Sequence, residues 1–519
     1  MNLIWGIDGA EWELLKQLQD SGRIPTLSRM IETGASGTLR STIPAYTGIA
    51  VPTLLTGKNP GTTGMVGFER VDGTLQDFTD IEDEVLWEIA GRQGLRTCAV
   101  GVRTTYPPRP VENGVVVSGD LYTPPDATDY MFPEHLPDDV PGVESFHDGL
   151  AELDELQKNA DIPCFIEAAS TTTRTQHGVF EDIIAETDPD LAMFWIGAAD
   201  KLQHLAWDEK DVLAEYYELI DGLLKQTLDR FEPEVTYVIS DHGFEAVYER
   251  ELHLNTWLER RGYLRTTPAA PMSRYIGPLV SKYVPNGLTD KAQSVLSKMG
   301  GAATSGDEAA SHSAGSTRRN VTVPGVDYER STAVMVNEWG INVLASNRRS
   351  EIVDSLVSDL RALHIQGEPV FRFVARREDV YTGRYLDRFP DVIVLPTREY
   401  HLNHTLSRSL TSPTGGSSHR SGYHIYNPDG VFAASGAEIP TAAGLTIAAE
   451  EFAPTVLHEL GVGVPADIDA SPMTEALSTH RRTDDVTTIR PRAPTLVDPE
   501  QKSTTNEDVE DRLRDMGYL

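Results

Sequence analysis

Two short motifs combine carboxylates and imidazoles at spacings that suit a metal ion. Asp200 and His204 are four positions apart, so on a helix both would project from one face, with Cβ atoms about 6 Å apart. Asp241 and His242 are adjacent and precede Gly243, which permits a tight turn. Carboxylates and imidazoles together suit Zn²⁺ or Mn²⁺. Taken alone, the first motif is by default a solvated helix face, and the second is by default a turn with a surface histidine.

Further candidate ligands and a candidate nucleophile lie elsewhere in the chain. Asp8 follows an apolar run at the N-terminus, and His424 lies in a loop before another apolar run, with His419 as an alternative to it. The segment 41–57 carries several threonines. A threonine hydroxyl is a poor nucleophile near neutral pH, but a bound divalent metal lowers its pKa and makes it reactive. The alternative reading of these residues is helix caps, turn residues and surface histidines.

The elements that must position these residues alternate between strands and helices. Such alternation predicts an α/β fold, with a mostly parallel central sheet and helices on both of its faces. In open α/β sheets, ligands bind outside the carboxyl ends of the strands. Asp8, Asp200 and Asp241 each come just after a predicted strand, so we expect them to share one site. The predicted strands are 3–7, 98–102, 115–117, 191–196 and 235–239, and the predicted helices are 11–21, 85–94 and 212–231.

The core is expected to be interrupted once. The segment 266–327 includes a run rich in Ser, Gly, Ala and Thr, which predicts an inserted cap region with a flexible loop. The end of the chain is polar, with Val509 and Leu513 at helical spacing. The expected organisation is an N-terminal part of the α/β core (1–265), the insertion (266–327), a C-terminal part of the core (328–478), and a polar linker with a short C-terminal helix (479–519).

Together these motifs resemble the alkaline phosphatase superfamily, in its type I phosphodiesterase/nucleotide pyrophosphatase branch. The resemblance covers most of residues 1–475, in the family's order. Counting back nine residues from Thr56 places the family's nucleophile on Thr47. The matching segments are 7–9, 43–60, 105–108, 118–120, 200–204, 240–244, 254–258, 262–264, 389–394 and 454–457.

The resemblance implies a metal-dependent phosphohydrolase, most of all a phosphodiesterase of the nucleotide pyrophosphatase type. It implies two divalent metal ions, usually Zn²⁺, and a phosphothreonine intermediate. The substrate would be a small-molecule or head-group phosphoester. The carboxylate and imidazole ligand set itself suits Zn²⁺, with Mn²⁺ as an alternative. The resemblance assigns Asp200, His204 and His424 to one ion, and Asp8, Asp241, His242 and the nucleophile Thr47 to the other.

Two positions depart from the nucleotide pyrophosphatases of the family. Ala50 stands where those enzymes carry an asparagine that contacts a phosphate oxygen, and Thr63 stands where a histidine often follows the nucleophile loop. Neither change removes a metal ligand, but both leave the substrate open. The sulfatase signature Cys-x-Pro-x-Arg is absent from the sequence. The alternatives are a transferase that moves a phosphoryl-linked group onto a glycan or lipid head group, and a catalytically silent, metal-stabilised binding protein.

The charge balance disfavours some partners. Basic residues number 45 and acidic ones 79, for a net charge of −34. Such a surface repels nucleic acid phosphates, so no nucleic acid polymer is expected as a partner. The basic residues are 35 Arg and only 10 Lys, a balance similar to that of halophilic proteins. The sequence shows neither an apolar run of about 18 residues nor a signal-peptide pattern, which predicts a cytoplasmic protein without a transmembrane segment.

We expect the folded state to depend on salt. A net charge of −34 repels itself in the compact state, and salt screens that repulsion. The free energy of unfolding should therefore be higher in molar KCl than in dilute buffer. Unfolding followed by circular dichroism at both concentrations tests this expectation, and equal stability in the two conditions would contradict it.

Overall fold

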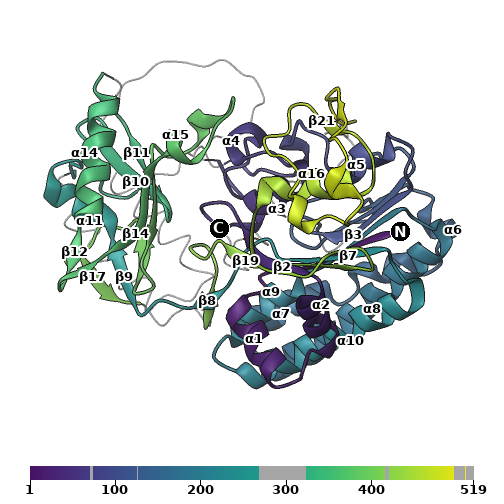
Figure 1. The fold of residues 1–519 in the computed structure, drawn as a ribbon. Helices are drawn as coiled ribbons and strands as arrows, with labels where there is room; N and C mark the ends of the chain where they lie inside the picture. The colour runs from purple at the N-terminus through teal and green to yellow at the C-terminus, as the bar shows by residue number, and fades with distance from the viewer. Residues whose placement is uncertain are drawn as a thin grey trace, which may run out of the picture.

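The chain forms a large α/β region and a smaller region with a sheet of its own (Figure 1). The structure is a computed structural model. Most of the predicted insertion and most of the predicted C-terminal helix lie outside the described residues. The structure describes residues 1–70, 74–124, 127–267, 323–345, 347–414 and 420–495, together with Val509 and Leu513.

Among the described residues, the central sheet has nine strands in the order β20-β2-β19-β7-β1-β6-β3-β4-β5. Neighbours run parallel, except that β19 is antiparallel to β2 and β7, and β5 is antiparallel to β4. The predicted mostly parallel sheet is confirmed. The bounds are β1 (Asn2–Ile7), β2 (Ala35–Arg40), β3 (Thr97–Val102), β4 (Gly114–Ser118), β5 (Met131–Phe132), β6 (Leu191–Ile196), β7 (Val235–Ile239), β19 (Asp429–Gly436) and β20 (Ala442–Ala448).

Helices cover both faces of this sheet (Figure 1). The central strand β1 is apolar on both sides, because Leu3 and Trp5 pack into one core cluster and Ile4 packs into the other. A strand buried on both faces needs such an uninterrupted apolar run. One face carries α1 (Trp12–Asp20), α2 (Pro25–Thr33), α7 (Leu150–Asn159), α8 (Ile162–Thr187) and α10 (Lys210–Phe231); the other carries α3 (Thr47–Thr56), α5 (Leu86–Gly91) and α16 (Ala449–Glu459).

The smaller region has its own hydrophobic core, which includes Trp257, Met335 and Val394. Tyr46 and Tyr423 pack against this core cluster, so the two regions meet next to α3. The predicted boundaries at 265, 327 and 478 stay predictions. The elements are a four-stranded sheet of β10 (Ala333–Asn337), β11 (Gly340–Val343), β15 (Val392–Pro396) and β14 (Phe371–Arg376), a three-stranded sheet of β16 (Tyr400–Asn403), β9 (Arg250–His253) and β17 (Thr411–Pro413), and the helices α11 (Leu254–Arg261) and α14 (Arg349–Arg361).

The polar segment after residue 478 is attached to the body rather than being a loose linker throughout. Its strand β22 (Thr488–Ile489) pairs in parallel with β21 (Val464–Pro465). A Cβ on Gly463 would lie 2.3 Å from Cγ2 of Ile489, so the missing side chain makes room for this contact. Farther on, Val509 and Leu513 are helical and buried in the main core.

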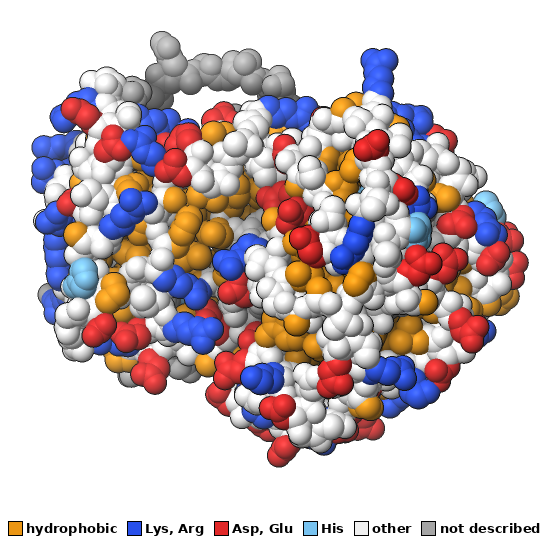
Figure 2. All heavy atoms as spheres, viewed as in Figure 1, with side chains coloured by type: hydrophobic (Ala, Val, Ile, Leu, Met, Phe, Trp, Pro, Cys, Tyr) orange, Lys and Arg blue, Asp and Glu red, His pale blue; other side chains and the backbone are white. Residues whose placement is uncertain are grey.

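The surface carries both signs of charge. Acidic and basic side chains are interspersed over the face shown in Figure 2. The described part of the chain has no helix that is both long enough and apolar enough to span a membrane. The structure thus shows no transmembrane helix within the described ranges.

Candidate active site

The predicted carboxylate ligands meet at one edge of the central sheet. Strands β7, β1 and β6 are neighbours and run parallel, so their carboxyl ends lie at the same edge. Asp8 follows β1 and Asp241 follows β7, while Asp200 lies on α9 (Ala198–Ala206), which begins just after β6. Sheet topology therefore gathers three side chains that are far apart in the sequence.

Thr47, His204 and His424 reach the same edge by other routes. Thr47 is the first residue of α3, and His204 lies one turn after the aspartate on α9. His424 comes between β18 (Gly422–Tyr423) and β19, and because β19 is antiparallel, the segment before it lies at this edge. The seven predicted site residues are nearly fully buried, the most exposed being His424 at 4%.

Two groups of side chains could each hold a metal ion. One group is Asp200, His204 and His424, and the other is Asp8, Asp200 and His242. Within each group the candidate ligand atoms lie within 4.8 Å of one another, and Asp200 belongs to both. The predicted ligand Asp241 adjoins the second group, with Oδ2 3.3 Å from Nε2 of His242. The structure thus brings the six predicted ligands together, whereas the alternative His419 lies outside the described residues.

The three histidines all turn Nε2 toward the site, because Nδ1 of each faces a backbone carbonyl oxygen. The distance from Nδ1 to that oxygen is 2.9 Å for His204, 3.0 Å for His242 and 2.8 Å for His424. A carbonyl can only accept, so Nδ1 donates and Nε2 of the neutral ring keeps its lone pair. Burial lowers the pKa of His242 to about 4 and that of His424 to about 3, which keeps both rings neutral at pH 7. Metal-binding histidines are oriented by hydrogen bonds of this kind.

Oδ1 of Asp8 and Oδ2 of Asp241 are buried at the site and accept no hydrogen bond from any described residue. The other oxygen of each is occupied, since Trp195 Nε1 donates to Asp8 Oδ2 at 3.0 Å and the Gly9 amide donates to Asp241 Oδ1 at 3.4 Å. Burial raises the pKa of Asp8 well above its usual value and that of Asp241 to about 7. A divalent cation would stabilise the ionised form of both buried carboxylates, so the residues present fit a metal.

The candidate nucleophile lies within this cluster. Thr47 Oγ1 is 3.1 Å from Nε2 of His242, and its side chain is buried. Because Thr47 is the first residue of a ten-residue helix, the positive end of the helix dipole faces the site. A helix N-terminus of this kind favours a phosphate group nearby.

The sequence as a whole matches one family model. The type I phosphodiesterase/nucleotide pyrophosphatase model matches residues 2–424. The chain belongs to this family. No curated protein matches it in sequence. Family membership and the Asp/His groups identify a metal-dependent phosphohydrolase that acts on phosphoester bonds, as the resemblance in the sequence predicted.

Solved structures of similar fold agree with an alkaline-phosphatase-like core. Phosphonoacetate hydrolase from Sinorhizobium meliloti 1021, in complex with phosphonoformate, has a TM-score of 0.51 and 15% identity, over 87% of this chain and 93% of that one. Human ectonucleotide pyrophosphatase/phosphodiesterase 5 has a TM-score of 0.51 and 13% identity, over 92% of this chain and 99% of that one. At these identities the similarity shows the shared fold.

Sequence reasoning missed one residue of the candidate site, Arg103. Its guanidinium is fully buried, with Nη1 3.0 Å from Asp200 Oδ2 and 3.2 Å from Asp8 Oδ2. Arg103 directly follows β3, a neighbour of β6, so it lies at the same edge of the sheet. Its place just after a predicted strand made it a candidate, but only the position of β3 beside β6 brings it to this site.

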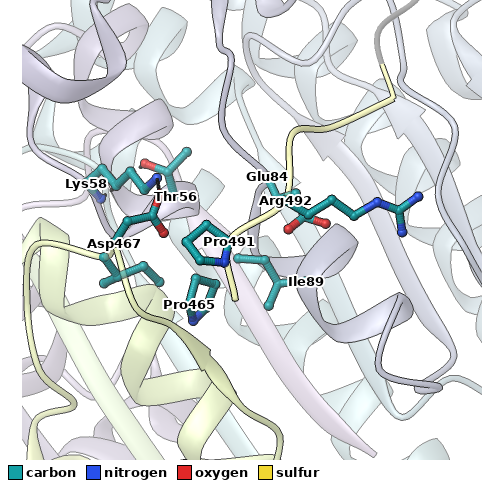
Figure 3. A pocket seen from close by; sticks show the side chains of 9 residues that line it. Thr56, Lys58, Glu84, Ile89, Pro465, Asp467, Pro491 and Arg492 are labelled. Carbon is teal, nitrogen blue, oxygen red and sulfur yellow. Dashed lines mark hydrogen bonds and ion pairs between the residues drawn. The ribbon is translucent and has the colours of Figure 1, made fainter. Parts of the chain in front are cut away.

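The lysine of the nucleophile loop lies at the other end of α3 and does not join the site. Lys58 Nζ is 2.7 Å from Asp83 Oδ1 and 2.5 Å from Asp467 Oδ2. Figure 3 shows Lys58 and Asp467 at the edge of a small pocket, which has room for about one water molecule. The ion pair of Lys58 with Asp467 therefore connects the end of α3 to the C-terminal part of the chain.

Proposed function

We propose that this protein hydrolyses phosphodiesters of small molecules or head groups at a two-metal site, with Thr47 as the nucleophile. The observation that carries the proposal is the convergence of the Thr47 hydroxyl with oriented imidazoles and buried carboxylates at one edge of the sheet. Nδ1 of each histidine faces a backbone carbonyl oxygen, so Nε2 carries the lone pair that can bind a metal. Buried oxygens of Asp8 and Asp241 accept no hydrogen bond from any described residue. This arrangement suits a reaction in which negative charge builds up on phosphoryl oxygens.

The proposed metal ligands are those of the two groups of side chains, with the adjoining Asp241 taken in place of Asp200 in the second group. Divalent cations there would lower the pKa of the threonine hydroxyl and neutralise charge on the phosphoryl oxygens. We propose Zn²⁺, because a mixed imidazole and carboxylate set suits it, with Mn²⁺ as the alternative. The proposed ligands are Asp200, His204 and His424 for one ion, and Asp8, Asp241 and His242 for the other, beside Thr47.

The proposed reaction has two displacements at phosphorus. Thr47 Oγ bonds to phosphorus as its proton passes to solvent, and the bond from phosphorus to the leaving oxygen breaks. The alcohol departs with a proton from solvent and leaves a phosphothreonine whose phosphoryl group still carries the second ester group of the substrate. Water then attacks phosphorus, releases a phosphate monoester and restores the threonine hydroxyl. The α3 N-terminus, where Thr47 lies, stabilises the negative charge of both transition states.

Hydrolysis of two chromogenic substrates tests the diester preference. We expect kcat/KM to be higher for bis-p-nitrophenyl phosphate than for p-nitrophenyl phosphate, measured on metal-loaded protein in high salt. Turnover of the monoester alone would contradict the proposed phosphodiesterase activity. Turnover of neither substrate by protein with two bound ions would favour a transferase that needs an acceptor.

We expect His424, rather than His419, to be the sixth ligand. Nε2 of His424 lies 3.8 Å from Asp200 Oδ1, and its Nδ1 is anchored on the Ala45 carbonyl oxygen. His424→Ala should therefore lose about one of two bound ions, while the control His419→Ala should keep both. Metal content per chain by inductively coupled plasma mass spectrometry distinguishes them, and the reverse pattern would contradict the assignment.

A further inference from the structure

Arg103 contacts one carboxylate from each proposed metal group. Its Nη1 lies 3.2 Å from Oδ2 of Asp8 and 3.0 Å from Oδ2 of Asp200. All three side chains are fully buried. A single guanidinium nitrogen thus joins the ligand that follows β1 to the ligand that follows β6.

In each of the two carboxylates, one oxygen contacts Arg103 and the other lies near a proposed metal-binding histidine. Oδ2 of each faces Arg103, while Oδ1 of each faces an imidazole. Oδ1 of Asp200 is 3.4 Å from Nε2 of His204, and Oδ1 of Asp8 is 3.6 Å from Nε2 of His242. Because one oxygen is held, rotation of the carboxylate is restricted, and the other oxygen stays directed at the proposed metal position.

Arg103 is itself held by a chain of buried charges. Its Nε lies 3.1 Å from Oδ1 of Asp120, whose Oδ2 is 2.7 Å from Nζ of Lys201. Lys201 in turn pairs with Asp154 at 2.8 Å. Asp120 follows β4, so the network crosses the ends of β1, β6, β3 and β4, which are adjacent in the sheet.

The glycine between β6 and α9 leaves room for this guanidinium. A Cβ on Gly197, between β6 and α9, would lie 2.8 Å from Nε of Arg103 and 3.1 Å from Oδ1 of Asp120. Any larger residue at Gly197 would push the guanidinium from its place. The position of Arg103 therefore depends on the missing side chain at Gly197 as well as on the ion pairs.

We propose that Arg103 is a positioning residue that aligns Asp8 and Asp200 for the two metal ions together. This role rests on the proposed two-metal centre. Arginine suits it, because its planar fork can hold Asp120 through Nε and the two ligand carboxylates through Nη1, which a single ammonium cannot match. The guanidinium also offsets part of the buried negative charge before metal binds.

Zinc affinity of metal-free protein tests the role without relying on turnover. Arg103→Lys should weaken the binding of both ions by about 10- to 100-fold, measured by titration against a chromophoric chelator. The matched control is Arg109→Lys. Arg109 is equally buried but pairs with Glu88, through Nε at 2.8 Å and Nη2 at 2.9 Å, and contacts no proposed ligand. The control should bind both ions with wild-type affinity.

Two results would overturn the role of Arg103, namely wild-type affinity for both ions in folded Arg103→Lys, or a loss confined to one ion. Should that variant fail to fold by circular dichroism, Gly197→Ala keeps the charge but displaces the guanidinium, and the same outcomes apply to it. Wild-type protein that binds no zinc would instead contradict the metal centre and with it this role. The two failures are thus distinguishable.

Discussion

Thr47→Ala is expected to abolish turnover while the protein keeps its metal ions. The substitution removes the oxygen proposed to attack phosphorus in the first displacement, so kcat should fall by at least about 10³-fold. The six proposed ligands remain, so metal content should stay close to that of the wild type. Initial rates on a diester substrate, with metal analysis of the same samples, measure both quantities.

A second threonine on the same helix provides the control. Thr53 is also fully buried on α3, and its hydroxyl donates to the Ile49 carbonyl oxygen at 2.9 Å. Thr53→Ala makes the same chemical change away from the site, so kcat should stay near the wild-type value. Substantial turnover by Thr47→Ala would show that another group attacks phosphorus.

Asp200→Asn is expected to have the second large effect, on metal binding itself. Asp200 belongs to both candidate metal groups and pairs with Arg103 at 3.0 Å. The amide keeps the size of the side chain but removes its charge, and it leaves Arg103 with less compensation in a buried place. Binding of both ions should weaken by at least about 100-fold, because changes even beyond the direct ligands cost 10- to 100-fold. Zinc titration of metal-free protein measures the loss.

Asp221→Asn separates this effect from the general cost of changing a buried aspartate. Asp221 is buried on α10 and accepts hydrogen bonds from the Thr26 and Leu27 amides at 3.1 and 2.7 Å, at the start of α2. Its substitution should lower the midpoint of thermal unfolding and leave zinc affinity unchanged. Wild-type zinc affinity in Asp200→Asn would contradict the assignment of Asp200 as a metal ligand.

The central sheet and the gathering of the site were predictable, because they depend on local patterns. The runs at 3–7, 191–196 and 235–239 are apolar except for Gly6 and Thr236, as is typical of strands buried on both faces. Polar residues after such runs meet at one edge when the strands are parallel neighbours. That reasoning placed Asp8 and Asp241 together without knowledge of the strand order.

Other features depend on which segments are neighbours in space, and local sequence patterns do not predict those neighbours. Arg103 belongs to the site because β3 lies beside β6, a pairing set by the whole sheet. His424 is placed by the two-residue pairing of β18 with β8 (Glu245–Ala246), which is too short to produce a periodic signal. The attachment of β22 likewise depends on the contact of Ile489 with Gly463, two residues far from each other in a mostly polar sequence.

The metal content of protein purified in high salt, measured together with diester turnover, tests the central claim most directly. The account predicts close to two zinc or manganese ions per chain, loss of turnover on chelation, and recovery when metal is added back. Protein that holds no metal and gains no activity when Zn²⁺ or Mn²⁺ is added would contradict the two-metal site, because its six ligands would then have no shared function.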